Sequence, residues 1–304
     1  MTAAKRLLEA VRDRVMVSAT SPFAHAPYPL AATLEHRGDS GLMGPGSVSW
    51  PVIGDVAAFV GGIRGLLIQA AHPEVAAGVG DHSLYRDDPM GRLSRTSSYV
   101  TATTYGAVPE VEAAVRRVQR AHRVVTGTSS RGVGYDAADP VLSAWVHNAL
   151  TDSFLTAHVT YGGIALTADD QNRFVREQNR VGALLGADPM PLTRRGLATW
   201  IGSHPDIARS PEMEDAVTFL TDPPLAGGLR IGYRILFEAA VATIPARLLN
   251  ALGLVPKPGA IAVGRSFVST LRWAIGYSPS WKLALERCGA PIPDGLFRHE
   301  ARVA

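Results

Sequence analysis

The chain has 304 residues, of which 46% are hydrophobic and 19% are charged. This is the composition of a globular protein that can bury a core. The net charge of +3 and the absence of a dense Lys/Arg run with interleaved aromatics argue against a nucleic-acid-binding protein. Cys288 is the only cysteine, which excludes an internal disulfide and a cysteine-based zinc site.

The sequence predicts a cytoplasmic protein without a transmembrane segment. Residues 1–16 lack the uninterrupted apolar stretch of a signal peptide. The apolar stretch 235–255 is interrupted by charged residues and by Pro245, so it falls short of the ~20 apolar residues of a spanning helix. We expect a short amphipathic helix over 2–16 and, because proline and glycine recur there, a wrapping arm over 17–53. The predicted division is therefore an N-terminal helix and arm (1–53) and a helical domain (54–304).

The segment from Gly54 has the apolar period of a helix, which should end before Pro73 because the residue before a proline avoids the helical region. His72 and His82 follow, ten residues apart across a predicted break at residues 78–80. This spacing does not match a pair of ligands one helical turn apart. We expect each histidine to cap a helix or stabilise a turn.

A second helix is predicted over 88–105, with Asp88 as its N-cap and Pro89 in its first turn. It is rich in serine and threonine, which are poor helix formers. Four polar residues share one face at helical spacing, namely Arg92, Arg95, Thr96 and Tyr99. Either this face is solvated, or it forms a polar wall over a bound anion.

A third helix is predicted over 109–127. His122 continues an aliphatic stripe formed by Val111, Val115, Val118 and Val125. A histidine in that position needs a hydrogen bond, a ligand or a metal, and a hydrogen-bonded core histidine is the simple alternative. Because the link at 106–108 is short, the two helices should be antiparallel. Arg92 and His122 then lie at the same level, each about 20 Å from the turn.

The remaining chain predicts further helices. Asp139 and Pro140 begin one that extends to residue 161, and its His147 is our second candidate for a metal ligand. His147 and His158 share a face of this helix. Other helices are expected over 167–185, over 195–220 as two shorter helices around His204, over 230–252 and over 265–277. The predicted fold is mostly α, a single domain of nine or ten helices.

Several catalytic motifs are missing from the chain. It has no Walker loop, no dinucleotide-binding glycine motif, no zinc-protease His-Glu-x-x-His and no serine-hydrolase elbow. What remains is histidines in helices, arginines beside hydroxyls and much apolar surface. This combination meets the needs of a haem, because imidazole binds iron, cations meet the propionates and apolar walls hold the macrocycle.

A run of motifs in the same order resembles one oxygenase family. The motifs are Gln69-Ala-Ala-His-Pro, Asp81-His-Ser, Arg92-Leu-Ser-Arg-Thr96, Ala121-His-Arg-Val-Val-Thr-Gly127 and Asp139-Pro-Val-Leu-Ser-Ala-Trp-Val-His147. Over roughly residues 50–250 the chain resembles the family that includes the fungal MpaB oxygenases and the bacterial latex-clearing rubber oxygenases.

The resemblance implies a globin-like helical core holding haem b and cleavage of isoprenoid double bonds with O₂. It makes His122 the iron ligand and places Arg92 and Thr96 beside the haem. Arg95 stands where rubber oxygenases have a lysine, and a guanidinium, which stays protonated, cannot replace that lysine on iron. Glu74 is a loose counterpart of the glutamate proposed as a base, at an offset spacing.

The resulting hypothesis is a haem-dependent oxygenase that acts with O₂ on an apolar substrate of unsaturated or terpenoid type. Its predicted catalytic residues are Arg95 and Glu74, its cofactor-binding residues are Arg92, Thr96 and His122, and His122 also binds the metal. The alternative is a haem-free helical protein of the same fold that binds a small molecule without catalysis.

Overall fold

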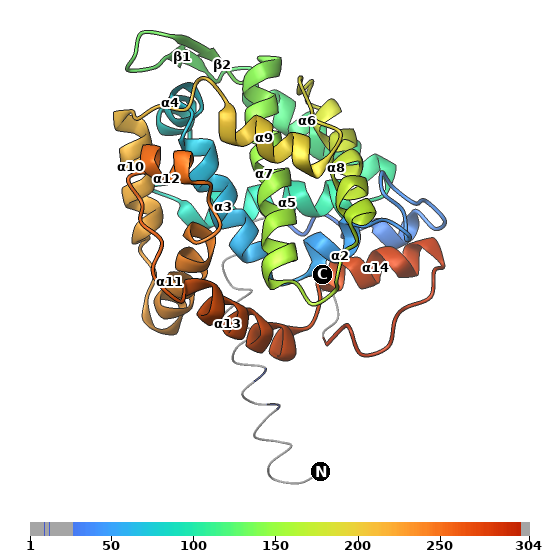
Figure 1. The fold of residues 1–304 in the computed structure, drawn as a ribbon. Helices are drawn as coiled ribbons and strands as arrows, with labels where there is room; N and C mark the ends of the chain where they lie inside the picture. Colours follow the sequence, from blue (N-terminus) through green and yellow to red (C-terminus); the bar gives the residue numbers. More distant parts are fainter. Residues whose placement is uncertain (1–8, 10–11, 13–26, 299–304) are drawn as a thin grey trace.

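A computed structural model describes residue 9, residue 12 and residues 27–298. This part of the chain is mostly α-helical and forms thirteen α-helices and one two-stranded sheet (Figure 1). The predicted all-α class is therefore confirmed. The helix expected over 2–16 lies outside the described residues.

Helix α7 (Pro140–Tyr161) runs through the middle of the molecule, with α3 (Ala58–Ala70) packed along it (Figure 1). Residues from both helices belong to the main apolar cluster, including Leu67, Ile68, Trp145 and Leu155. Further helices surround this pair, namely α8 (Ala168–Ala183), α9 (Arg194–Ser203), α10 (Pro211–Thr221), α11 (Gly227–Val241), α12 (Ala246–Leu252) and α13 (Ala260–Ile275).

The contact between α3 and α7 depends on two glycines of α3. A Cβ atom on Gly61 would lie 2.7 Å from the Phe154 ring and 3.0 Å from the Phe154 Cα. A Cβ atom on Gly65 would lie 2.8 Å from Leu150 Cδ2. The helices are thus closer than two side-chain-bearing surfaces allow. Beside this contact, Arg64 forms a buried ion pair with Asp152 at 2.7 Å.

Several helix starts agree with the sequence prediction. Helix α5 (Pro89–Tyr105) begins after Asp88, whose carboxylate accepts a hydrogen bond from the Gly91 amide. Helix α7 begins after Asp139, whose carboxylate accepts from two amides. Thr167 caps α8 in the same way. These caps form because a short polar side chain accepts hydrogen bonds from amides that have no partner inside the helix.

Other bounds differ from the prediction. Helix α4 (Pro73–His82) continues through Gly78 and Gly80, so the predicted break is wrong. Helix α6 (Val108–His122) ends five residues earlier than expected, because the chain then forms the antiparallel strands β1 (Thr126–Thr128) and β2 (Gly134–Asp136). In this hairpin Gly127 pairs with Tyr135.

The remaining differences are extra helices. The predicted arm contains the short helix α2 (Ser49–Gly54), as well as one 3₁₀ turn (Thr33–Glu35). The predicted helix over 230–252 is two helices, α11 and α12, because Pro245 interrupts it. The C-terminal region contains α14 (Pro279–Cys288), for which the sequence analysis predicted no helix.

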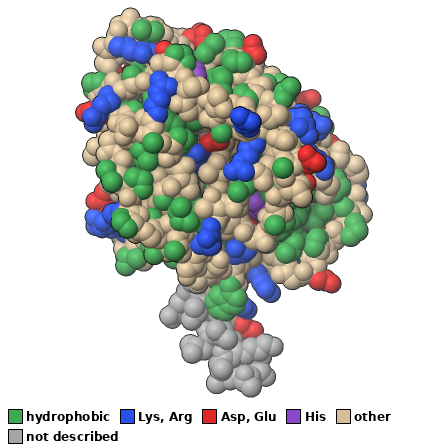
Figure 2. Space-filling model, viewed as in Figure 1, with side chains coloured by type: hydrophobic (Ala, Val, Ile, Leu, Met, Phe, Trp, Pro, Cys, Tyr) green, Lys and Arg blue, Asp and Glu red, His purple; other side chains and the backbone are tan. Residues whose placement is uncertain are grey.

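The surface agrees with the small net charge. Basic side chains on the face in Figure 2 are scattered among acidic and apolar ones. Within the described part of the chain, no helix combines the length and apolarity that crossing a membrane requires.

The close contact of α3 with α7 gives a first prediction. Gly61→Ala should destabilise the protein by about 1–3 kcal/mol, because the new methyl group forces Phe154 and the helix backbone apart. Gly62→Ala is the matched control, since a Cβ atom there meets nothing within 4 Å. That change should stabilise by about 0.5–1 kcal/mol through helix propensity. Urea unfolding would measure both changes, and equal effects would contradict the packing argument.

Candidate functional site

The corner between α5 and α6 is fixed by buried hydrogen bonds. The Trp50 indole donates to the Thr104 carbonyl, and the Tyr105 hydroxyl donates to the Trp50 carbonyl, both at 2.8 Å. Buried Arg287 donates to the Tyr105 carbonyl at 2.6 Å, and Asp39 accepts from the Val108 amide at 2.9 Å. Both helices are regular α-helices on either side of this hydrogen-bonded turn. The prediction that Arg92 and His122 lie at the same level requires this regularity.

The predicted basic residues of α5 have different surroundings. The Arg92 guanidinium is partly buried, 5.7 Å from the centroid of the Tyr85 ring, and burial lowers its pKa. It makes no hydrogen bond or ion pair with any residue in 27–298. Arg95 is exposed and ion-paired with Asp88 at 3.2 Å. Thr96 is exposed on the same helix.

The hydroxyl groups of α5 divide into two kinds. Ser97 and Thr103 donate to carbonyls of their own helix, which is the usual way that such residues are accommodated there. The Tyr99 hydroxyl is buried and has no partner within the described residues. Burial raises its pKa, so the phenol stays protonated and can donate a hydrogen bond. The face that carries Arg92 thus contains a second polar group without a partner.

His122 is the last residue of α6. The predicted stripe is confirmed as far as His122, because Val111 and Val115 are buried and His122 is partly buried, whereas the arginines at 116, 117 and 120 are exposed. Val125 lies beyond the end of α6 and is not part of this helical face. Burial lowers the pKa of His122, and the charge of Asp136 on β2 opposes this shift. Its ring makes no hydrogen bond to any residue in 27–298. The imidazole is therefore neutral at pH 7, with both nitrogens unoccupied.

The other candidate histidines of these helices have hydrogen-bond partners. His147 Nε2 lies 3.3 Å from the Thr151 hydroxyl, and His158 Nε2 lies 2.8 Å from the Ile164 carbonyl. His82 Nε2 lies 3.2 Å from the Thr126 carbonyl and so joins the end of α4 to β1. Each of these three side chains thus has a protein partner at Nε2, and His158 Nδ1 is buried without one in the described chain.

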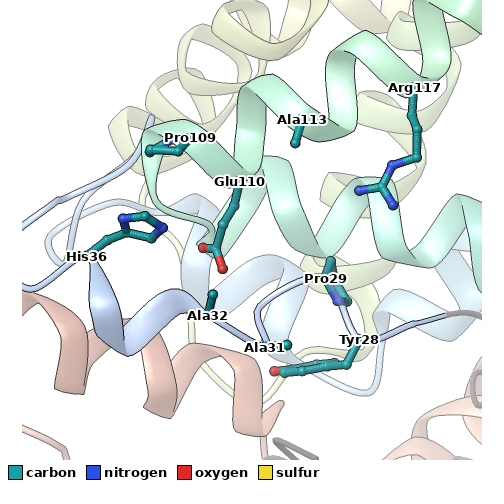
Figure 3. Close-up of a pocket in the computed structure, with 9 residues that line it drawn as sticks. All are labelled: Tyr28, Pro29, Ala31, Ala32, His36, Pro109, Glu110, Ala113 and Arg117. Atoms are coloured by element: carbon teal, nitrogen blue, oxygen red, sulfur yellow. The ribbon is translucent and has the colours of Figure 1, made fainter.

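A pocket of about 270 Å³ lies beside the N-terminal half of α6 (Figure 3). Glu110 and Arg117 of α6 line it together with Tyr28 and His36 of the N-terminal segment. A second pocket, of about 330 Å³, lies between α13 and the segment 295–298. Neither pocket includes His122, which is at the opposite end of α6 from the first.

Glu74 lies on α4 under the β1–β2 hairpin. Its carboxylate accepts two hydrogen bonds from Arg131, at 2.6 and 2.5 Å, and one from Ser129 at 2.8 Å. Burial by itself would raise the pKa of Glu74, but these hydrogen bonds lower it. The carboxylate is therefore ionised and anchors the hairpin to α4.

His72 occupies the N-cap position of α4 but makes no capping hydrogen bond, so the predicted capping role is wrong. Its ring lies beside Glu74, His204 and Asp206. Sequence analysis assigned no function to His204, Asp206 or Arg131. The only sequence signal was that both histidines precede a proline, in His72-Pro73 and His204-Pro205.

Residues 50–273 match the family model described as "ER-bound oxygenase mpaB/B'/Rubber oxygenase, catalytic domain". The chain belongs to this oxygenase family. The match covers α3 to most of α13 and includes Arg92, Arg95, Thr96, Tyr99 and His122. Searches of curated proteins and of solved structures gave no significant match.

The family assignment confirms the resemblance seen in the sequence motifs. The domain is an oxygenase catalytic domain, and an oxygenase requires a substrate and O₂. The family description includes ER-bound members, so the predicted cytoplasmic location stays a prediction for this oxygenase.

The histidines of the oxygenase domain give a prediction for its pH dependence. Burial lowers the pKa of His147 to about 4, against about 6.5 in an unfolded chain. Between these values the unfolded chain binds a proton that the folded protein does not, so stability falls as the pH falls from about 6.5 to about 4. His147→Gln should reduce the stability difference between pH 7.5 and pH 5 by an amount on the order of 2 kcal/mol.

Urea unfolding of both proteins at the two pH values measures this difference. His82→Gln is the control, because His82 is an exposed histidine, and it should leave the wild-type difference unchanged. An unchanged pH dependence in His147→Gln would contradict the prediction.

Proposed function

We propose that this domain binds haem b through His122 and uses O₂ to oxidise an apolar substrate of unsaturated or terpenoid type. The observation that carries the proposal is the state of His122, a partly buried and neutral imidazole without a hydrogen-bond partner in the described chain. It lies in a chain that belongs to an oxygenase family. A neutral imidazole with a free nitrogen is the usual iron ligand of haem proteins.

The residues predicted to share a site with His122 fit a haem in charge as well as in donor type. Arg92 is a partly buried cation without a counter-ion among residues 27–298, and a propionate would supply one. The Tyr99 phenol is a buried donor without an acceptor in the described chain, and a carboxylate would supply that acceptor too. Unsatisfied polar groups of this kind are costly in a structure without a ligand. When bound, haem supplies the iron chemistry that activates O₂.

The remaining predicted residues have supporting roles in this proposal. Thr96 lies one turn after Arg92 and offers a hydroxyl on the same helix. Arg95 adds a second cation, held at the surface by Asp88. The role of Glu74 as a base stays a prediction, because both of its oxygens already accept hydrogen bonds from Arg131 or Ser129.

One observation favours the alternative of a haem-free binding protein. The two pockets of about 270 and 330 Å³ are near the lower end of the range for small-molecule sites and lie away from His122. In that case the protein should bind an apolar small molecule equally well with and without His122.

His122→Ala should fold but lose stoichiometric haem, because the imidazole is the proposed bond from protein to iron. The protein is expressed with a haem precursor, and the Soret absorbance gives the haem-to-protein ratio. His82→Ala is the control and should retain haem. Full occupancy with an unchanged spectrum in His122→Ala, together with loss in His147→Ala, would transfer the role to His147.

Arg92→Ala should weaken haem retention, and Arg92→Lys should restore only part of it. Lysine supplies a charge but lacks the fork that binds a carboxylate through two hydrogen bonds. Arg116→Ala is the matched control, since Arg116 is an exposed arginine of α6 that pairs with Glu112 of the same helix. Haem transfer to an acceptor protein would measure retention. Equal transfer rates in all four proteins would remove Arg92 from the site.

A further inference from the structure

A second group of polar side chains lies where α4 begins beside the turn between α9 and α10. His72 and His204 are buried, and Asp206 is about half exposed, with 43% of its side chain accessible. One ligand atom from each of the three residues lies within 4.8 Å of the other two. The three residues are brought together although 132 positions separate His72 from His204.

The three residues are close but do not satisfy one another. Asp206 Oδ2 lies 3.9 Å from His72 Nε2 and 3.9 Å from His204 Nδ1, which is too long for a hydrogen bond. Neither ring nitrogen of His72 makes a hydrogen bond within the described chain, although the side chain is 97% buried. Three atoms are candidate metal ligands, namely His72 Nε2, His204 Nδ1 and Asp206 Oδ2. Within the described residues only His204 Nδ1 has a hydrogen bond, a long one of 3.4 Å from the Asp206 amide.

The surrounding charges favour a cation in this gap. Glu74 and Asp206 are two carboxylates, and Arg131 is the one guanidinium that bridges them, at 2.5 and 3.3 Å. Arg131 contacts Oδ1 of Asp206, so Oδ2 remains directed at the histidines. The two carboxylates and the one guanidinium therefore sum to a charge of −1.

The group also has the outer partner that metal-binding histidines usually have. His72 Nδ1 lies 3.3 Å from Glu74 Oε2, while its Nε2 faces Asp206. The two atoms make no hydrogen bond in this structure, but a carboxylate that accepts one from a ring nitrogen leaves the lone pair of the other nitrogen for a metal. Rings of Trp145 and Trp200 enclose His204, with centroids 4.8 and 4.7 Å away. The half-exposed Asp206 leaves an opening to solvent.

We propose that His72, His204 and Asp206 bind one divalent first-row transition-metal ion. A tetrahedral ion with bonds of about 2.0–2.2 Å holds its donors about 3.3–3.6 Å apart, so the 3.9 Å distances would have to shorten by a few tenths of an ångström when the ion binds. Two imidazoles and one carboxylate suit Zn²⁺ or Fe²⁺, whereas Mg²⁺ and Ca²⁺ prefer oxygen donors. The ion connects the start of α4 to the α9–α10 turn and leaves a coordination position open to solvent.

The test titrates the full-length protein, freed of metal with a chelator, with Zn²⁺ by calorimetry and with Co²⁺ by visible absorbance. One equivalent should bind to the wild type and raise its Tm, because a ligand of the folded state stabilises it. Asp206→Asn should weaken binding at least tenfold, and His204→Ala should abolish it. His82→Ala removes an exposed histidine from the other end of α4 and should bind like the wild type.

Absence of a stoichiometric site in the wild type would overturn the proposal, as would wild-type affinity in Asp206→Asn. If His204→Ala fails to fold, Asp206→Asn decides, since its side chain is half exposed and close in shape to the original. The inference does not rest on the haem proposal. His122→Ala should still bind one Zn²⁺, so failure of one proposal is distinguishable from failure of the other.

Discussion

The close contact between α3 and α7 is the constraint on which the core and the His72 group depend. Gly61 and Gly65 let the two helices approach until the side chains of α7 touch the backbone of α3. The buried Arg64–Asp152 pair then fixes their register, because removing either partner would leave an uncompensated buried charge. Helix α3 leads directly to His72 and α4, and α7 supplies the Trp145 ring that packs against that histidine. A shift along this contact would move the His72 group as a whole.

The polar groups of the protein fall into satisfied and unsatisfied sets, and this difference carries most of the functional argument. Arg287 and Glu74 are buried and nearly saturated with hydrogen bonds, and each joins segments that are distant in sequence. Arg92, Tyr99 and His122 lack such partners in the described chain, and so does His72. Buried polar groups without partners are uncommon in folded proteins, and for this reason the two proposed ligands are placed at these residues.

Many helix starts could be predicted because the start of a helix depends on only a few consecutive residues. Asp88-Pro89, Asp139-Pro140 and Thr167 contain in a few residues the acceptor that an exposed helix start needs. The apolar stripe that includes His122 could also be predicted, because the helical period alone determines which residues share a face. The end of α6 was not predictable in this way. The chain leaves the helix after His122 because Tyr135 and Arg131 of the hairpin bind Asp81 and Glu74 of α4.

The sequence by itself determined the helical class, the family, most helix starts and the presence of Arg92 and His122 on two consecutive helices. Those properties depend on short-range period, capping and ordered motifs. Only the tertiary structure decided which polar residues have partners, because a partner can be any distance away in the chain. In the folded chain Arg131 donates a hydrogen bond to Glu74, and the Thr151 hydroxyl lies beside His147. His72 lies beside His204 and Asp206. Packing of α3 on α7 and of the hairpin on α4 created these neighbours, and no local pattern encodes them.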